Sequence, residues 1–358
     1  MEQWFIAAKR ADFNGIAERF HVSPVLARLM RNRDLTTDAQ MEKYLHGTLQ
    51  DLYEPSLVKD AKKGVDIVRK KIEEGKKIRI ISDYDVDGVS SNYILYKGLL
   101  RCGADVDYRI PDRVADGYGI NEHLIDQAYE DGIDTVITCD NGIAAAPQIA
   151  YGKSLGLTFV VTDHHDVPFT EEDGVRREIL PEANAVINPK RDDCPYPFKG
   201  ICGAVVAFKF VQLLYDAFGI DRKETEEFLE MTAMATVCDV MILQDENRIL
   251  VKEGLRRMNE TKIPGLRALI AVNHLEEKKL TAYHLGFILG PCINASGRLT
   301  TAKKALDLLL CTDVSRCQAM AEELLLLNAE RKEMTRQGEE EAHRYLETTG
   351  HIHDKVLV

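Results

Sequence analysis

Short apolar runs alternate with helical stretches between residues 78 and 187, and this alternation restricts the fold more than any other feature of the sequence. The runs that we predict to be β-strands are residues 78–82, 105–110, 135–139, 158–162 and 185–187. The intervening segments that we predict to be helices are residues 90–100, 122–129 and 144–155. Strands joined through helices run parallel, and the helices cover both faces of the sheet. We therefore expect an α/β fold with a parallel β-sheet flanked by helices.

Helices are predicted on both sides of this region. The N-terminal ones are residues 13–20, 24–33 and 38–45, followed by 57–74, where apolar residues recur at helical spacing. The later ones are residues 203–237, 255–272, 302–310 and a long acidic helix from 314 to about 345, before Gly350. We expect an N-terminal helical segment and a C-terminal helical region ending in a long helix. Residues 355–358 begin another apolar strand, so we expect the chain to be part of a longer protein.

Composition excludes several classes of protein. The 358-residue chain carries a formal net charge of −12, which argues against a protein that coats nucleic acid through Lys and Arg but allows a local basic groove. Its apolar runs are shorter than the ~18 residues of a membrane span, and its first four residues do not begin a signal peptide. Its eight cysteines include no C-x-x-C pair, as expected for buried reduced thiols. We therefore expect a cytoplasmic protein with no membrane segment.

Acidic residues or histidines follow three of the predicted strands. The segments are DYDVDG at 83–88, DNG at 140–142 and DHH at 163–165. The carboxyl ends of parallel strands meet at one edge of the sheet, where open α/β sheets bind ligands. If the backbone of residues 83–87 stays extended, its three aspartates also point the same way. The side chains expected to converge are Asp83, Asp85, Asp87, Asp140, His164 and His165.

A cluster of this kind suits divalent cations. Carboxylates brought together without a cation repel one another and resist ionisation. Oxygen ligands mixed with imidazole favour Mn²⁺ or Mg²⁺, and this many acidic groups fit two ions ~3.5–4 Å apart. Asp-Gly and Asn-Gly are also common turn formers, so any one of these strand ends alone could be only a turn. Three of them on one sheet favour a metal-dependent phosphoesterase.

The motifs, taken in order, resemble the DHH phosphoesterase superfamily, which is named for the triplet found here at 163–165, and within it the RecJ proteins. In the branches that act on short oligonucleotides or pyrophosphate, a histidine stands four residues before the first Asp of the D-x-D pair, where this chain has Ile81. Further RecJ-like segments are IPDR (110–113), GYG (117–119), NPK (188–190), CDV (238–240), NR (247–248), GP (290–291) and NASGR (294–298).

The resemblance implies roles for individual residues. The implied ligands of two Mn²⁺ or Mg²⁺ ions, with Asp140 as the bridge, are Asp83, Asp85, Asp87, Asp140, His164 and Asp239. Asp163 would orient an imidazole by accepting its N–H, and His165 would face the scissile phosphate. Arg113, Asn294 and Arg298 would contact phosphate or substrate, since a guanidinium can grip phosphate with two hydrogen bonds.

The resemblance also implies a function and a division of the chain. The function is that of a RecJ-like 5′→3′ exonuclease in DNA repair and recombination, a monomer acting on single-stranded DNA with a single-strand-binding protein or a helicase as a further partner. The segments are 1–55 (N-terminal helices), 56–260 (DHH catalytic domain), 261–312 (helical region with the GPxxNAxGR motif), 313–350 (long connecting helix) and 351–358 (start of a DHHA1 domain).

Two alternative functions stay open. The first is a DHH phosphodiesterase of short oligonucleotides or cyclic dinucleotides, against which Ile81 counts. The second is a non-catalytic RecJ-like scaffold, against which the complete set of implied metal ligands counts. Comparing the hydrolysis of a long single strand with that of a dinucleotide distinguishes the exonuclease from the first alternative. Metal titration distinguishes it from the second alternative.

Overall fold

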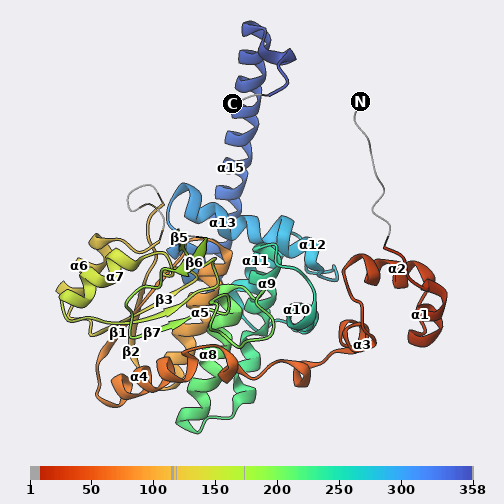
Figure 1. Cartoon of the computed structure of the whole chain (residues 1–358). Helices are drawn as coiled ribbons and strands as arrows, with labels where there is room; N and C mark the ends of the chain where they lie inside the picture. Colours follow the sequence, from red (N-terminus) through yellow and green to blue (C-terminus); the bar gives the residue numbers. More distant parts are fainter. Residues whose placement is uncertain (1–8, 114–116, 118, 173, 357–358) are drawn as a thin grey trace.

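A computed structural model of the chain describes residues 9–113, 117, 119–172 and 174–356. Figure 1 shows a central sheet with helices packed around it, three N-terminal helices to one side and a long C-terminal helix that extends away from the body. The sequence predictions also used residues that lie outside the described part of the chain, namely residues 1–4, Tyr118 and residues 357–358.

The central sheet contains parallel strands in the order β2-β1-β3-β4-β7. These strands are β1 (Lys77–Ser82), β2 (Asp105–Arg109), β3 (Thr135–Cys139), β4 (Thr158–Thr162) and β7 (Ala185–Ile187). Successive side chains of β1 enter opposite cores, since Ile80 packs into one hydrophobic cluster and Ile81 into the other. A sheet buried on both faces needs apolar residues at nearly every position, which explains the continuous apolar runs. The predicted parallel α/β sheet is confirmed.

Helices on the two faces of the sheet form separate cores. The helices α4 (Ala61–Glu73), α5 (Val86–Arg101) and α8 (Gly203–Phe218) contribute to the core that contains Ile80. The helices α6 (Glu122–Glu130) and α7 (Ala146–Ser154) contribute to the core that contains Ile81. Because α5 follows β1 directly, it begins at the carboxyl edge of the sheet.

The chain contains further helices before and after the sheet. They are α1 (Phe13–Phe20), α2 (Pro24–Asn32), α3 (Asp38–His46), α9 (Leu229–Cys238), α10 (Asp245–Met258), α11 (Pro264–Val272), α12 (Ala282–His284), α13 (Gly290–Leu299), α14 (Lys303–Leu310) and α15 (Val314–Thr349). Shorter turns of 3₁₀ helix are Leu49–Asp51, Pro55–Leu57, Arg222–Phe228 and His351–His353, and a π-helical turn is Leu285–Leu289. Gly350, with φ 77°, ends α15 as predicted.

Two segments that were each predicted as one continuous helix are interrupted. Residues 255–272 form parts of two helices rather than one, because Pro264 begins α11 and proline is tolerated in the first turn but not in a helix interior. Residues 203–237 are also interrupted, because Gly219 adopts the left-handed conformation (φ 68°) that ends α8.

An antiparallel hairpin of strands β5 (Phe169–Glu172) and β6 (Val175–Glu178) was not predicted. The residues of β6 are almost entirely exposed and most are charged. Such a hairpin lacks the apolar alternation by which a half-buried strand is recognised. Its formation depends on cross-strand pairing, which the local sequence does not reveal.

Among the described residues, the structure contains no helix that combines the length and apolar character needed to span a bilayer. All eight cysteines lie in the described part of the chain, and none is bonded to another. Six of them are buried, as predicted, whereas Cys238 and Cys311 are partly exposed.

Candidate metal centre

Strands β1, β3 and β4 end level with one another. Ser82 pairs with Cys139, and Cys139 pairs with Thr162, so the last residues of the three strands are in register. An aspartate follows each strand, and the carboxyl edge of a parallel sheet is where ligands bind. These side-by-side aspartates are Asp83, Asp140 and Asp163.

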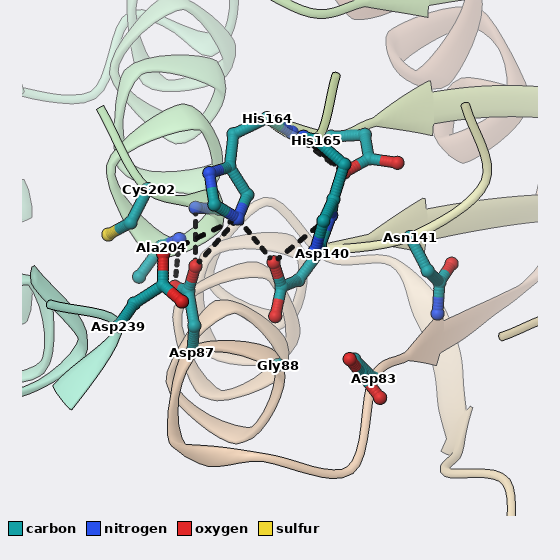
Figure 2. Close-up of polar contacts among 12 residues, drawn as sticks. Asp83, Asp87, Gly88, Asp140, Asn141, His164, His165, Cys202, Ala204 and Asp239 are labelled. Atoms are coloured by element: carbon teal, nitrogen blue, oxygen red, sulfur yellow. Dashed lines mark hydrogen bonds and ion pairs between the residues drawn. The ribbon is translucent and has the colours of Figure 1, made fainter. Parts of the chain in front are cut away.

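The imidazole of His164 lies at the centre of a group of carboxylates (Figure 2). Its Nε2 is 3.0 Å from Asp140 Oδ1, 3.4 Å from Asp87 Oδ2 and 3.7 Å from Asp239 Oδ2. Asp239 is the C-cap of α9, more than seventy residues beyond the strand ends. The predicted convergence of Asp87, Asp140 and His164 is confirmed.

The expectation that Asp83, Asp85 and Asp87 share one direction on an extended backbone was wrong. Helix α5 begins at Val86, four residues earlier than predicted. Asp85 is its N-cap, and its Oδ1 accepts the backbone N–H groups of Asp87 (2.9 Å) and Gly88 (3.0 Å). Aspartate is among the preferred N-cap residues, so the same residue that resembles a metal ligand also starts the helix. The first helical turn then sends Asp87 to a different side of the cluster.

Donor atoms gather in three sets, each with all its atoms within 4.8 Å of one another. The sets are Asp87, His164 and Asp239; Asp83, Asp85 and Asp140; and Asp140, His164 and His165. Asp140 Oδ1 and His164 Nε2 are both buried and lack a hydrogen-bond partner, although they face each other at 3.0 Å. Buried polar atoms are normally paired. Two unpaired acceptors that face each other fit the ligand set of a divalent cation.

The electrostatics of the cluster favour a cation. Burial, followed by the charge of Asp85, raises the pKa of Asp83 to about 7. Burial, followed by the charge of Asp87, raises the pKa of Asp239 to about 7 and that of Asp140 well above its usual range. Burial also lowers the pKa of His164, which favours the neutral imidazole that binds metals. A bound cation would offset the repulsion and favour the ionised carboxylates.

Asp163 lies behind the cluster and fixes His165. Its Oδ1 lies 2.8 Å from His165 Nδ1 and also accepts the backbone N–H of His164 (2.7 Å), while its Oδ2 accepts the N–H of Ile143 (2.9 Å). Burial acts to raise the pKa of Asp163, but the hydrogen bonds and charge of His165, together with the N–H of Ile143, hold it below the usual value. The bond to Asp163 raises the pKa of His165 to about 9. Asn188 Nδ2 holds the same histidine by donating to its carbonyl oxygen (2.9 Å).

The N-terminus of α8 also contributes to the site, which the sequence did not reveal. The backbone N–H groups of Gly203 and Ala204 donate to the two carboxylate oxygens of Asp87, each at 2.7 Å. Cys202, the N-cap, provides no side-chain cap, so a carboxylate from α5 occupies that role. The partial positive charge of a helix N-terminus stabilises such an anion. The only local signal was a helix that starts without a capping side chain.

Gly203→Ala is expected to destabilise the protein by about 1–3 kcal/mol, because an added methyl group must be forced into a packed site. A Cβ at this position would lie 2.8 Å from both Cβ and Oδ1 of Asp140. Gly200→Ala is the matched control, since its Cβ would meet neighbours only at 3.4 Å or more. Thermal unfolding of the two variants tests this, and equal melting temperatures would contradict it.

The part of the chain that carries this centre matches a known protein family. Residues 77–236, which contain the sheet and the DHH triplet, match the family described as "DHH family, N-terminal domain". The fold superimposes on a manganese-bound crystal structure of exonuclease RecJ with a TM-score of 0.68 and 33% sequence identity, covering 77% of this chain and 67% of that chain. The chain belongs to the DHH family, in its RecJ branch.

Other RecJ proteins match nearly the whole chain. The single-stranded-DNA-specific exonuclease RecJ of Bacillus subtilis is 35% identical over 343 residues, which are 96% of this chain and 42% of the relative. The structure of RecJ from Thermus thermophilus in complex with Mn²⁺ has a TM-score of 0.75 and 29% identity, covering 91% of this chain and 45% of that chain. The chain therefore spans about half the length, or slightly less, of these two RecJ proteins.

The three residues predicted to contact substrate lie around the loop between β1 and α5. The guanidinium of Arg113 lies 5.4 Å from the ring centroid of Tyr84. Arg298 directly follows Gly297, where an added Cβ would lie 2.5 Å from the carbonyl oxygen of Tyr84. Asn294 Oδ1 accepts the backbone N–H of Val86 at 3.0 Å and thereby ties α13 to the start of α5. Their contact with substrate stays a prediction.

Proposed function

We propose that this chain is the catalytic part of a RecJ-type exonuclease that degrades single-stranded DNA in the 5′→3′ direction. The observation that carries the proposal is the position of Asp140, whose carboxylate forms one donor set with Asp83 and Asp85 and also lies 3.0 Å from Nε2 of His164, a member of the set with Asp87 and Asp239. The manganese-bound RecJ structures that resemble this fold support the same reading. The likeness to RecJ favours DNA over short oligonucleotides, and the complete donor set favours an enzyme over a scaffold.

The donor sets suggest how two Mn²⁺ or Mg²⁺ ions would be held. Asp87, His164 and Asp239 would hold one ion, and Asp83 and Asp85 would hold the other. Asp140 would contribute to both. Two such ions, when bound, activate water and offset the negative charge of a phosphodiester.

Residues around the cluster would position the DNA backbone. His165, charged at neutral pH through its bond to Asp163, would face the scissile phosphate and stabilise its developing charge. Arg113 and Arg298 would contact neighbouring phosphates with their planar guanidinium groups. A groove that admits only a single strand would be completed by stacking and basic residues that the described chain does not identify.

The proposal extends to the setting of the enzyme. The absence of disulfides among its eight cysteines supports a reducing compartment, the cytoplasm. We propose a monomer that works with a single-strand-binding protein or a helicase, and a division of the chain at residues 55, 260, 312 and 350. Size measurement by light scattering and limited proteolysis test these two points.

The 358-residue chain is expected to hydrolyse a long 5′-phosphorylated single strand in Mn²⁺, at a rate at least about tenfold above that for duplex DNA or a dinucleotide. Chelation with EDTA should stop the reaction, because the carboxylate cluster then loses its cations. Labelled-substrate gels measure both rates, and calorimetric titration with Mn²⁺ measures binding independently. Faster cleavage of the dinucleotide would favour the short-oligonucleotide alternative, and no Mn²⁺ binding would favour the scaffold.

A further inference from the structure

Asn141 stands out among the buried polar residues at the carboxyl edge of the sheet. Its side chain is 2% exposed, and neither its amide nitrogen nor its amide oxygen has a hydrogen-bond partner. Burying an amide without partners costs about 1–3 kcal/mol. Unpaired buried groups in folded proteins commonly mark a place where an ion or ordered water binds.

The turn that carries Asn141 is rigid. Asp140 adopts a left-handed conformation with φ 59°, and Gly142 has φ 106°, where a Cβ would also lie 2.5 Å from Thr138 Oγ1. The same Thr138 hydroxyl donates to the backbone carbonyl of Asn141 at 2.9 Å. Backbone strain of this kind persists only where the surrounding structure fixes it. The side chain of Asn141 is therefore held in place from its backbone, without a bond of its own.

The side chain of Asn141 extends toward one half of the metal cluster. In Figure 2 its amide nitrogen is turned toward the carboxylate of Asp83, and both lie on the side of Asp140 opposite His164 and Asp239. Asp83 is 4% exposed and belongs to the donor set with Asp85 and Asp140. An N–H donor beside an ionised carboxylate forms a stronger hydrogen bond than one between neutral groups.

We propose that Asn141 is a positioning residue of the cation site formed by Asp83, Asp85 and Asp140. When a cation holds Asp83 in its ionised form, the Asn141 amide donates a hydrogen bond to that carboxylate, directly or through one water, and keeps it aimed at the ion. The inference rests on the proposed function only in requiring a cation at this site. It assigns a role to a residue that the sequence motif alone presents as part of an Asn-Gly turn.

If Asn141 had a purely structural role, its loss would lower the stability of the fold and leave the metal affinity unchanged. A structural asparagine stabilises the fold through its hydrogen bonds, as Asn184 does by accepting the backbone N–H of Phe159 at 3.0 Å. The Asn141 side chain makes no such bond, so its removal takes away an unpaired buried amide. Residues that hold a metal ligand in place instead govern metal affinity, and their loss typically weakens metal binding by about 10–100-fold.

The test compares Asn141→Ala with the matched control Asn184→Ala in two measurements. Calorimetric titration with Mn²⁺ gives the affinity of each site, and thermal unfolding in EDTA gives the stability of the cation-free protein. Asn141→Ala is expected to weaken Mn²⁺ binding at one site by about tenfold or more while leaving the cation-free melting temperature unchanged or higher. Asn184→Ala should lower that melting temperature and leave Mn²⁺ affinity unchanged.

Two outcomes overturn the inference. One is unchanged Mn²⁺ affinity in Asn141→Ala, and the other is a loss of cation-free stability as large as that of Asn184→Ala. If the unmodified chain binds Mn²⁺ but Asn141→Ala binds it equally well, only this inference fails. If the unmodified chain does not bind Mn²⁺ at all, the proposed metal centre fails with it.

Discussion

Asp140→Asn is expected to lower Mn²⁺-dependent hydrolysis by about a thousandfold or more, equivalent to roughly 4 kcal/mol of transition-state stabilisation. The carboxylate of Asp140 belongs to the set with Asp83 and Asp85 and lies 3.0 Å from His164 of the other site, so its loss would weaken both cation sites at once. Asparagine isolates the effect of charge, because it tolerates the left-handed backbone (φ 59°) that Asp140 adopts and that alanine would find strained.

Two measurements separate this effect from misfolding. Calorimetry should find Mn²⁺ binding weakened at both sites, and circular dichroism should find the fold intact. Asp105→Asn is the matched control, since Asp105 is exposed at the opposite end of the edge strand β2 and should tolerate the same exchange. Full activity of Asp140→Asn would refute the two-cation proposal.

Asp163→Asn is expected to reduce hydrolysis by roughly 100-fold or more, because it removes the negative charge that orients the His165 imidazole and stabilises its protonated form. Asp163 Oδ1 receives the imidazole Nδ1–H at 2.8 Å, and an amide could accept this bond but would carry no charge. The pKa of His165, about 9 in the metal-free protein, should fall toward or below the usual 6.5. Proton NMR of the imidazole in EDTA measures that pKa.

The raised pKa of His165 also determines how the effect of Asp163→Asn on the free energy of unfolding depends on pH. Because the pKa of His165 in the folded protein lies above its usual value, the pair with Asp163 contributes fully to stability below pH 6.5. That contribution disappears as the pH rises through about 9. The difference in unfolding free energy between Asp163→Asn and the unmodified chain should therefore shrink over this range.

Asp166→Asn is the control for the loss of hydrolysis, since the exposed carboxylate of Asp166 pairs only with Lys190 among the described side chains. Equal activity in the Asp163→Asn and Asp166→Asn variants would contradict the role of Asp163.

The regular part of the fold was predictable because it is encoded locally. Five apolar runs gave the strands of the parallel sheet, and three of them were predicted with an aspartate directly after the last residue. Helices α1 and α3 were predicted to within one residue of their observed bounds. The sequence was less informative where one residue serves two purposes: Asp85 is both a candidate ligand and the N-cap that starts α5 early.

Residue type and the predicted parallel direction of the strands therefore determined that the carboxylates and imidazoles that follow three strands meet at one edge of the sheet, because the carboxyl ends of parallel strands lie at the same edge. Only the tertiary structure decided which of these side chains lie on each side of Asp140. It added the N–H groups at the start of α8 and the buried amide of Asn141, and it placed Asp239, which only the resemblance to RecJ had implied, beside His164. The α8 N–H groups and the Asn141 amide carry no local pattern that marks them, since their surroundings depend on how distant segments pack against the sheet. Packing over long sequence separations is set by the whole core, which no short segment of sequence encodes.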